Sequence, residues 1–132
     1  MSTRATGTFE IKNWDEKTYE EIGGGAKLTR ASVKKSFQGD IEGEGRIEYL
    51  MAYREDGTAS YVGLERIVGR LGGKSGSFVL QHVGTFEGGV AKTTFTIVPG
   101  SGTGELRGLK GEGRFAVGHE PPFPMTLDYD VE

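Results

Sequence analysis

Glu65 and His82 are the two side chains of this sequence best suited to chemistry, because each interrupts an apolar and aromatic alternating segment. If the two segments pair as a hairpin, Glu65 lies one diagonal step from His82. A buried carboxylate without a partner is costly, so it takes up a proton or pairs with a neighbour. A glutamate–histidine pair in an aromatic pocket could transfer a proton or steer a cyclisation. A structural polar network inside the protein is the alternative, and both interpretations stay open.

Other kinds of reactive site have little support. The sequence contains no cysteine, which excludes disulfides, thiolate metal sites and a cysteine nucleophile. His82 and His119 are the only histidines, and no acidic residues accompany them at ligand spacing, so we expect no metal and no cofactor. We expect His119 to be exposed, between a glycine and a proline-rich turn. The Gly-x-Ser-x-Gly elbow of serine hydrolases is missing, and residues 72–76 (GGKSG) lack the strand–loop–helix setting of a phosphate-binding loop.

Composition limits the class of protein and its partners. The 132 residues fit one domain spanning residues 1–132, with a formal net charge of −3 and scattered lysines and arginines. We therefore expect no nucleic-acid partner. No apolar run is long enough to span a membrane, and the N-terminal residues lack the apolar core of a secretory signal. These features predict a soluble, cytoplasmic protein.

Alternating segments separated by glycine turns indicate an all-β meander. The expected strands are residues 5–13, 26–37, 41–54, 58–71, 75–87, 90–98, 112–117 and 125–131. Residues 14–25 are expected to be a connection, with room for one helical turn. Eight long antiparallel strands favour a closed barrel, because an open sheet of this size would leave exposed edges.

The turns at residues 55–57, 72–73 and 88–89 fix a register that separates two faces. The face expected to point inward contains Ile47, Tyr49, Met51, Tyr53, Tyr61, Gly63, Glu65, Ile67, Gly76, Phe78, Leu80, His82, Gly84, Phe86, Ala91, Thr93, Phe95 and Ile97. The opposite face is mixed in charge, with Glu48–Arg66 and Glu42–Arg70 as expected cross-strand pairs. On that outer face, Val62, Leu64 and Val68 form an apolar stripe that we interpret as a homo-oligomer contact.

The inward aromatic residues predict where a ligand would lie. Tyr49, Met51, Tyr61, Phe78 and Phe95 are the expected pocket residues around Glu65 and His82. Gly63 and Gly84 remove side-chain volume beside this pair, so an interior space could open there. Trp14 and Phe123 could close the barrel ends or gate entry, although core packing is the role that we favour for them.

Four segments together resemble a bacterial family known as domain of unknown function 3224. They are residues 36–45 (SFQGDIEGEG), 61–66 (YVGLER), 76–84 (GSFVLQHVG) and 99–111 (PGSGTGELRGLKG). The resemblance spans nearly the whole chain and implies an eight-stranded barrel like that of allene oxide cyclases and dirigent proteins, a calycin-like fold. It does not imply allene oxide cyclase activity, since the active-site residues of those enzymes have no matching positions here. In such a barrel, residues 100–111 would cross between the sixth and seventh strands, with Leu106 packed on the core.

Three functional hypotheses follow. The first is a barrel that binds a small apolar or aromatic molecule in its interior. The second is a cofactor-free isomerase or cyclase in which Glu65 and His82 move a proton. The third is a structural homo-oligomer whose barrel is filled by side chains.

Overall fold

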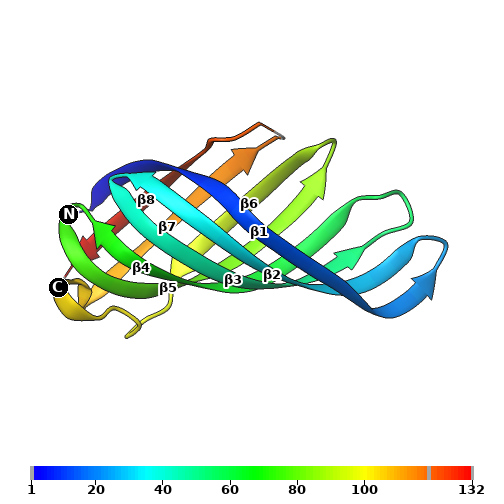
Figure 1. Ribbon diagram of the computed structural model, residues 1–132, viewed down its shortest axis with the longest axis horizontal. Coiled ribbons are helices and arrows are strands. Elements are labelled where there is room, and N and C mark those ends of the chain that lie inside the picture. The colour runs from blue at the N-terminus through cyan, green and yellow to red at the C-terminus, as the bar shows by residue number, and fades with distance from the viewer. Residues whose placement is uncertain (1, 119, 132) are drawn as a thin grey trace.

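The computed structural model describes residues 2–118 and 120–131, and its strands form a closed antiparallel barrel in chain order (Figure 1). β8 closes the ring by pairing with β1, Ala5 lying opposite Leu127. The strands are β1 (Thr3–Gly23), β2 (Ala26–Gly39), β3 (Ile41–Tyr53), β4 (Ala59–Leu71), β5 (Lys74–Glu87), β6 (Val90–Ile97), β7 (Leu109–Val117) and β8 (Phe123–Val131). A short 3-10 turn, η1 (Gly104–Leu106), lies between β6 and β7. The predicted all-β meander of eight strands is confirmed.

The register of the central hairpins also agrees with the turns in the sequence. Tyr53 lies opposite Ala59, Leu71 opposite Lys74 and Glu87 opposite Val90. This register turns the apolar face of β3 to β6 inward, and its alternate residues are buried along each strand. The three turn assignments therefore predicted correctly which side chains enter the barrel.

The expected connection at residues 14–25 is wrong, because β1 continues to Gly23 and pairs with β2 from Gly7 to its end. The second half of β1 is exposed on both faces, so it lacks the apolar–polar alternation that marks a half-buried strand. Register shifts after Ile11, Thr18 and Glu21 break the period further. The resulting β1–β2 hairpin, together with β3–β4, extends to the end of the molecule opposite the two termini (Figure 1).

Smaller corrections concern β7, β8 and one charge pair. β7 begins at Leu109 and β8 at Phe123, earlier than expected, because both residues are buried and paired. Glu42 lies directly opposite Arg70 as expected. Glu48, in contrast, forms its ion pair with Arg30 of β2, at 2.9 Å from Nη2 to Oε1, rather than with Arg66.

One end of the barrel is closed by the glycine-rich crossing between β6 and β7. Leu106 in η1 is fully buried in the core, as expected. The crossing lies directly on β5, where the backbone nitrogen of Ser77 donates to Thr103 Oγ1 at 3.0 Å and the hydroxyls of these residues are 2.7 Å apart. Gly76 allows this approach, since a Cβ there would overlap the carbonyl oxygen of Thr103.

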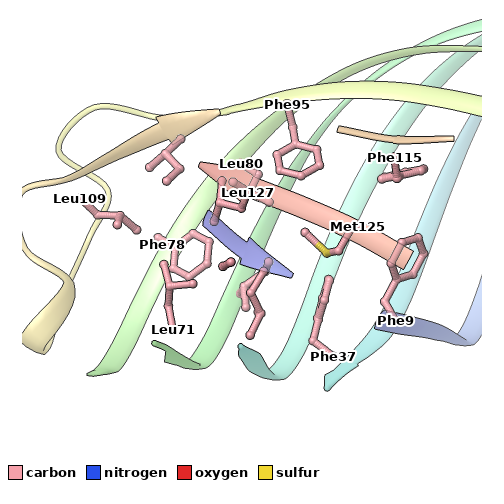
Figure 2. Close-up of a cluster of buried hydrophobic side chains, with 14 of the residues drawn as sticks. Phe9, Phe37, Leu71, Phe78, Leu80, Phe95, Leu109, Phe115, Met125 and Leu127 are labelled. Carbon is pink, nitrogen blue, oxygen red and sulfur yellow. The ribbon is translucent and has the colours of Figure 1, made fainter. Parts of the chain in front are cut away.

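The hydrophobic core fills the barrel from this closed end towards the middle. Figure 2 shows Phe78, Leu80 and Leu127 packed inside the ring of strands, with Phe9 and Phe115 farther along it. A second, smaller cluster of buried residues comprises Ala31, Val33, Ile47, Tyr49, Met51 and Tyr61. In the part of the chain that the structure describes, no helix has the length and apolar character needed to cross a membrane.

Candidate functional site

A cavity of about 270 Å³ occupies the barrel end opposite η1, where the β3–β4, β5–β6 and β7–β8 turns lie. Its walls are formed almost entirely by apolar and aromatic side chains. The lining residues are Phe9, Ile11, Trp14, Lys35, Tyr49, Met51, Tyr53, Ala59, Tyr61, Phe86, Ala91, Phe115, Val117, Gly118 and Phe123. An apolar, aromatic lining is typical of small-molecule sites, and the volume is slightly below the roughly 300 Å³ at which their usual range begins.

The structure divides the five expected pocket residues into two groups. Tyr49, Met51 and Tyr61 line the cavity. Phe78 and Phe95 are absent from its walls and belong to the core cluster, each 2 % exposed (Figure 2). The ligand-sized space is therefore nearer the turns than the sequence suggested.

Gly63 and Gly84 do not open an interior space, because aromatic rings fill the volume beside them. A Cβ at Gly84 would lie 2.5 Å from ring atoms of Tyr61, and one at Gly63 would lie 2.9 Å from Cδ1 of Tyr49. The two glycines thus allow the tyrosine rings to lie flat against neighbouring strands. The hydroxyl of Tyr61 is then 2.6 Å from Thr93 Oγ1 on β6.

Glu65 and His82 form a buried pair, as their diagonal placement suggested. His82 Nε2 and Glu65 Oε1 are 2.9 Å apart, and each side chain is 1 % exposed. Neither residue lines the cavity. The ring of His82 packs instead against Phe95, with centroids 5.2 Å apart, and against Tyr49 at 6.3 Å.

Lys35 on β2 is the third member of this cluster, and sequence analysis missed it. Its Nζ lies 3.6 Å from Glu65 Oε2 and donates to the Tyr49 hydroxyl at 3.4 Å, and the side chain is 2 % exposed. The ammonium also stands 4.7 Å from the ring centroid of Phe9 and 5.5 Å from that of Phe115. Of the described residues that line the cavity, Lys35 is the only one with a charge.

The cluster holds an ion pair beside a neutral histidine. Burial alone would raise the pKa of Glu65, but Lys35 and the hydrogen bond from His82 outweigh it and lower that pKa. Burial opposes the charge of Lys35 as well, yet Glu65 and then Tyr49 bring its pKa above the usual value. Burial dominates for His82 and lowers its pKa despite Glu65. Neutral His82 therefore donates Nε2–H to the carboxylate, which leaves Nδ1 as a buried nitrogen with no hydrogen-bond partner among the described residues.

The signal for Lys35 was present in the alternation of β2. Val33, Lys35 and Phe37 share one parity, and all three are buried. Lysine is seldom buried, so a lysine between two apolar residues of the same parity is ordinarily expected to reach solvent at the edge of the apolar face and not to point into the core. Only the pairing of β2 with β3, which puts Lys35 opposite Gly45, brings it within reach of Glu65.

The mouth of the cavity is ordered by the carboxylate of Glu16. Glu16 Oε2 accepts hydrogen bonds from the hydroxyls of Tyr53 at 2.6 Å and Thr29 at 2.7 Å, and Oε1 accepts from Trp14 Nε1 at 2.9 Å. Burial and this bond to Glu16 raise the pKa of Tyr53, so it remains a phenol. Trp14 is 43 % exposed and lines the cavity, so its place is at the mouth rather than in the core. Phe123 lines the cavity from β8 and is buried.

The outer apolar stripe is exposed and larger than expected. Val62, Leu64 and Val68 are 49 %, 55 % and 49 % exposed. The stripe also includes Leu50 and Val83, which lie on either side of Val62 in the strand register.

Within residues 2–118 and 120–131, no three histidine, cysteine, aspartate or glutamate side chains are grouped so that they could hold a metal ion. His119, expected to be exposed, lies outside the described residues.

Comparisons with known proteins agree with the fold and name no activity. A family model described as "Protein of unknown function (DUF3224)" matches residues 5–129. The crystal structure of a protein of unknown function from the same family, from Shewanella oneidensis MR-1, is 33% identical. Their alignment covers 100% of this chain and 99% of that chain, with a TM-score of 0.85. A search of curated proteins found no match.

Proposed function

Because the chain belongs to the DUF3224 family of proteins of unknown function, its role has to be inferred from its own cavity, and we propose that it binds a small apolar or aromatic molecule there. The observation that carries this proposal is the cavity of about 270 Å³ at the turn end of the barrel. What sets this cavity apart is its lining, because the walls consist almost entirely of apolar and aromatic side chains from the barrel interior, as is usual for small-molecule sites.

The lining supports an apolar guest. Burial of apolar surface contributes roughly 25 cal/mol per Å², and the aromatic walls add specific ring contacts. The rings of Phe9 and Phe115 are 5.1 Å apart in an edge-to-face arrangement, and Tyr49 and Tyr61 repeat this geometry at 5.3 Å. A planar guest could extend the same packing between these pairs.

The experiment is a calorimetric titration with 2-ethylnaphthalene, an apolar two-ring probe, on the wild-type chain and two matched variants. Ala91→Phe puts a ring into the cavity, whereas Ala52→Phe adds the same ring on the exposed outer face of β3. We expect binding to wild type and Ala52→Phe and at least a tenfold loss in Ala91→Phe. Undetectable binding to wild type, or equal binding to both variants, would contradict the proposal.

If the protein is an isomerase or cyclase, a residue other than Glu65 or His82 must contact the substrate. Glu65 and His82 are behind the cavity wall, so a guest would touch Lys35 and Tyr49 first. In such an enzyme Lys35 would be the residue that meets the substrate, with Glu65 and His82 setting its charge. This is the second candidate because Lys35, one of the two buried charges, lines the cavity.

The outer surface, the filled part of the barrel, the cellular location and the wider kinship are also matters of proposal. The outer stripe on β3 to β5 is proposed as a contact between copies of this chain, independent of the cavity. The third hypothesis, a filled barrel, fits the half of the interior next to η1 and not the half with the cavity. A cytoplasmic location and kinship with allene oxide cyclase barrels also stay predictions.

A further inference from the structure

We propose that the cavity selects an electrically neutral apolar or aromatic molecule that carries one hydrogen-bond-accepting oxygen, such as a ketone or aldehyde, and that Lys35 and Tyr49 bind this oxygen. The inference rests on the proposed function, since it names the class of guest for the same cavity. It adds a polar requirement to what would otherwise be an unselective apolar space.

Lys35 has more N–H donors than the described residues offer oxygen acceptors near it. An ammonium carries three N–H donors. Among the described residues, the oxygens close to Nζ are the Tyr49 hydroxyl at 3.4 Å and Glu65 Oε2 at 3.6 Å. These two can use at most two donors, and the second distance is beyond ordinary hydrogen-bond range. At least one N–H is left, and the aromatic rings around it cannot accept it as an oxygen would.

The hydroxyl of Tyr49 offers a second donor. Its hydroxyl oxygen accepts from Lys35, so its own O–H is free to donate to a further acceptor. Burial keeps the phenol protonated, because it raises the pKa of Tyr49. Both Lys35 and Tyr49 line the cavity. One oxygen of a guest can therefore receive two donors from this wall.

The two buried charges beside the cavity cancel. Lys35 is already neutralised by Glu65, and both side chains are almost fully buried. An anionic guest would leave one net negative charge in an apolar interior, which is costly unless a proton is taken up with it. A neutral guest with an accepting oxygen uses the free donors without that cost. The charge balance therefore favours a carbonyl over a carboxylate.

The aromatic rings around Lys35 indicate what the guest should carry besides its oxygen. Phe9, Phe115 and Tyr49 all border the cavity and face the ammonium at 4.7, 5.5 and 5.8 Å from ring centroid to Nζ. An aromatic or unsaturated body next to the carbonyl would pack on these rings. The cavity volume of about 270 Å³ limits that body to roughly one or two rings.

The test uses three probes with one ring system: 2-acetylnaphthalene, 2-ethylnaphthalene and 2-naphthoate. They present a ketone, a methylene or a carboxylate at the same position. Dissociation constants are measured by calorimetry on the wild-type chain and on Lys35→Met/Glu65→Gln, which removes both charges together. We expect the preference for the ketone over the ethyl compound to be at least about tenfold greater in wild type than in the double variant.

The outcomes separate this inference from the function on which it rests. If the ethyl compound binds but the ketone preference is the same in both proteins, the inference is overturned and apolar binding stands. If naphthoate binds wild type more tightly than the ketone, the neutral class is overturned in favour of an anion. If none of the probes binds, the proposed function and the inference both fail.

A second measurement does not depend on the double variant folding. The ketone is labelled with ¹³C at the carbonyl and its chemical shift is recorded in complex with wild type. Donation by Lys35 and Tyr49 would move the signal to higher frequency than in an apolar solvent. A bound ketone whose shift equals that in an apolar solvent would overturn the inference.

Discussion

Lys35 Nζ lies 3.6 Å from Glu65 Oε2 inside the barrel, where the two side chains are only 2 % and 1 % exposed. The pair joins β2 to β4 across the interior, and His82 on β5 extends it through a hydrogen bond of 2.9 Å. Burying an ion pair seldom stabilises a protein more than apolar packing of the same volume. Its position beside a cavity therefore suggests a role in binding rather than in folding.

Removing one charge of the pair should destabilise the barrel more than removing both. Lys35→Met leaves Glu65 as a buried carboxylate, and losses of about 3–5 kcal/mol are typical when a buried pair is broken. Lys35→Met/Glu65→Gln is expected to recover most of this loss, because a glutamine oxygen can still accept from His82. The free energy of unfolding in urea is the measurement.

An exposed ion pair supplies the control for this comparison. Arg4 and Asp128 pair at 2.8 Å on the barrel surface, and Arg4→Met should destabilise the protein much less than Lys35→Met, because solvent screens exposed charges. If the double variant were as unstable as Lys35→Met alone, the loss would come from packing and not from an uncompensated charge.

His82 should remain neutral in the folded protein at a pH where a free imidazole is half protonated. Burial lowers its pKa from 6.5, and the carboxylate of Glu65 selects the tautomer with hydrogen on Nε2. Nitrogen-15 NMR of the ring should give a bare Nδ1 and a protonated Nε2 at about pH 6.5. A ring that titrates at or above 6.5 would contradict the neutral state.

Stability should fall as the pH is lowered below 6.5. The native state keeps His82 neutral while the unfolded chain takes up a proton, so the unfolded state is favoured as pH decreases through this range. Glu65 acts in the same direction at lower pH, because its pKa is below 4.5 in the native state and its stabilising charge is lost on acidification. Each group can contribute a slope of at most about 1.4 kcal/mol per pH unit.

Urea unfolding between about pH 7.5 and 5 measures this dependence, with His82→Asn as the comparison. The variant should show a shallower slope than wild type over this range, whatever its absolute stability. Equal slopes would mean that His82 has the same proton affinity in the folded and unfolded chains.

The outer stripe gives a prediction independent of the cavity. If Val62, Leu64 and Val68 pack against a second copy, Leu64→Lys should dissociate the oligomer, because a buried unpaired cation is costly. Light scattering after size-exclusion chromatography measures the mass. Ala116→Lys, on the exposed face of β7, is the matched control and should leave the mass unchanged. A monomeric wild type at high concentration would rule out this contact.

The fold could be predicted well because glycine turns and period-two alternation act locally. The register of β3 to β6 follows from three turns, and one residue of error at any of them would have brought charges into the core. The second half of β1 could not be recognised, because it is exposed on both faces and carries bulges. Its strand character comes from pairing with β2 and not from its own pattern.

The site was only partly predictable, for a related reason. Glu65 and His82 stood out as polar residues in apolar strands, and their register was correct. Lys35 depends on how β2 lies against β3. The last paired residues there are Phe37 and Gly43, so this connection is not one of the two- or three-residue hairpin turns from which the other registers were predicted. The cavity depends on how far the tyrosine rings reach, and these rings fill the spaces that the glycines leave.

A crystal structure of the chain with bound 2-acetylnaphthalene is the most direct test of the central claim that the barrel interior is a binding site. The expected result is a naphthalene ring in the cavity beside Phe9 and Phe115, with its carbonyl oxygen within hydrogen-bond distance of Lys35 Nζ. A cavity without ligand density at saturating concentration, or a ligand bound only to the outer face, would contradict the account.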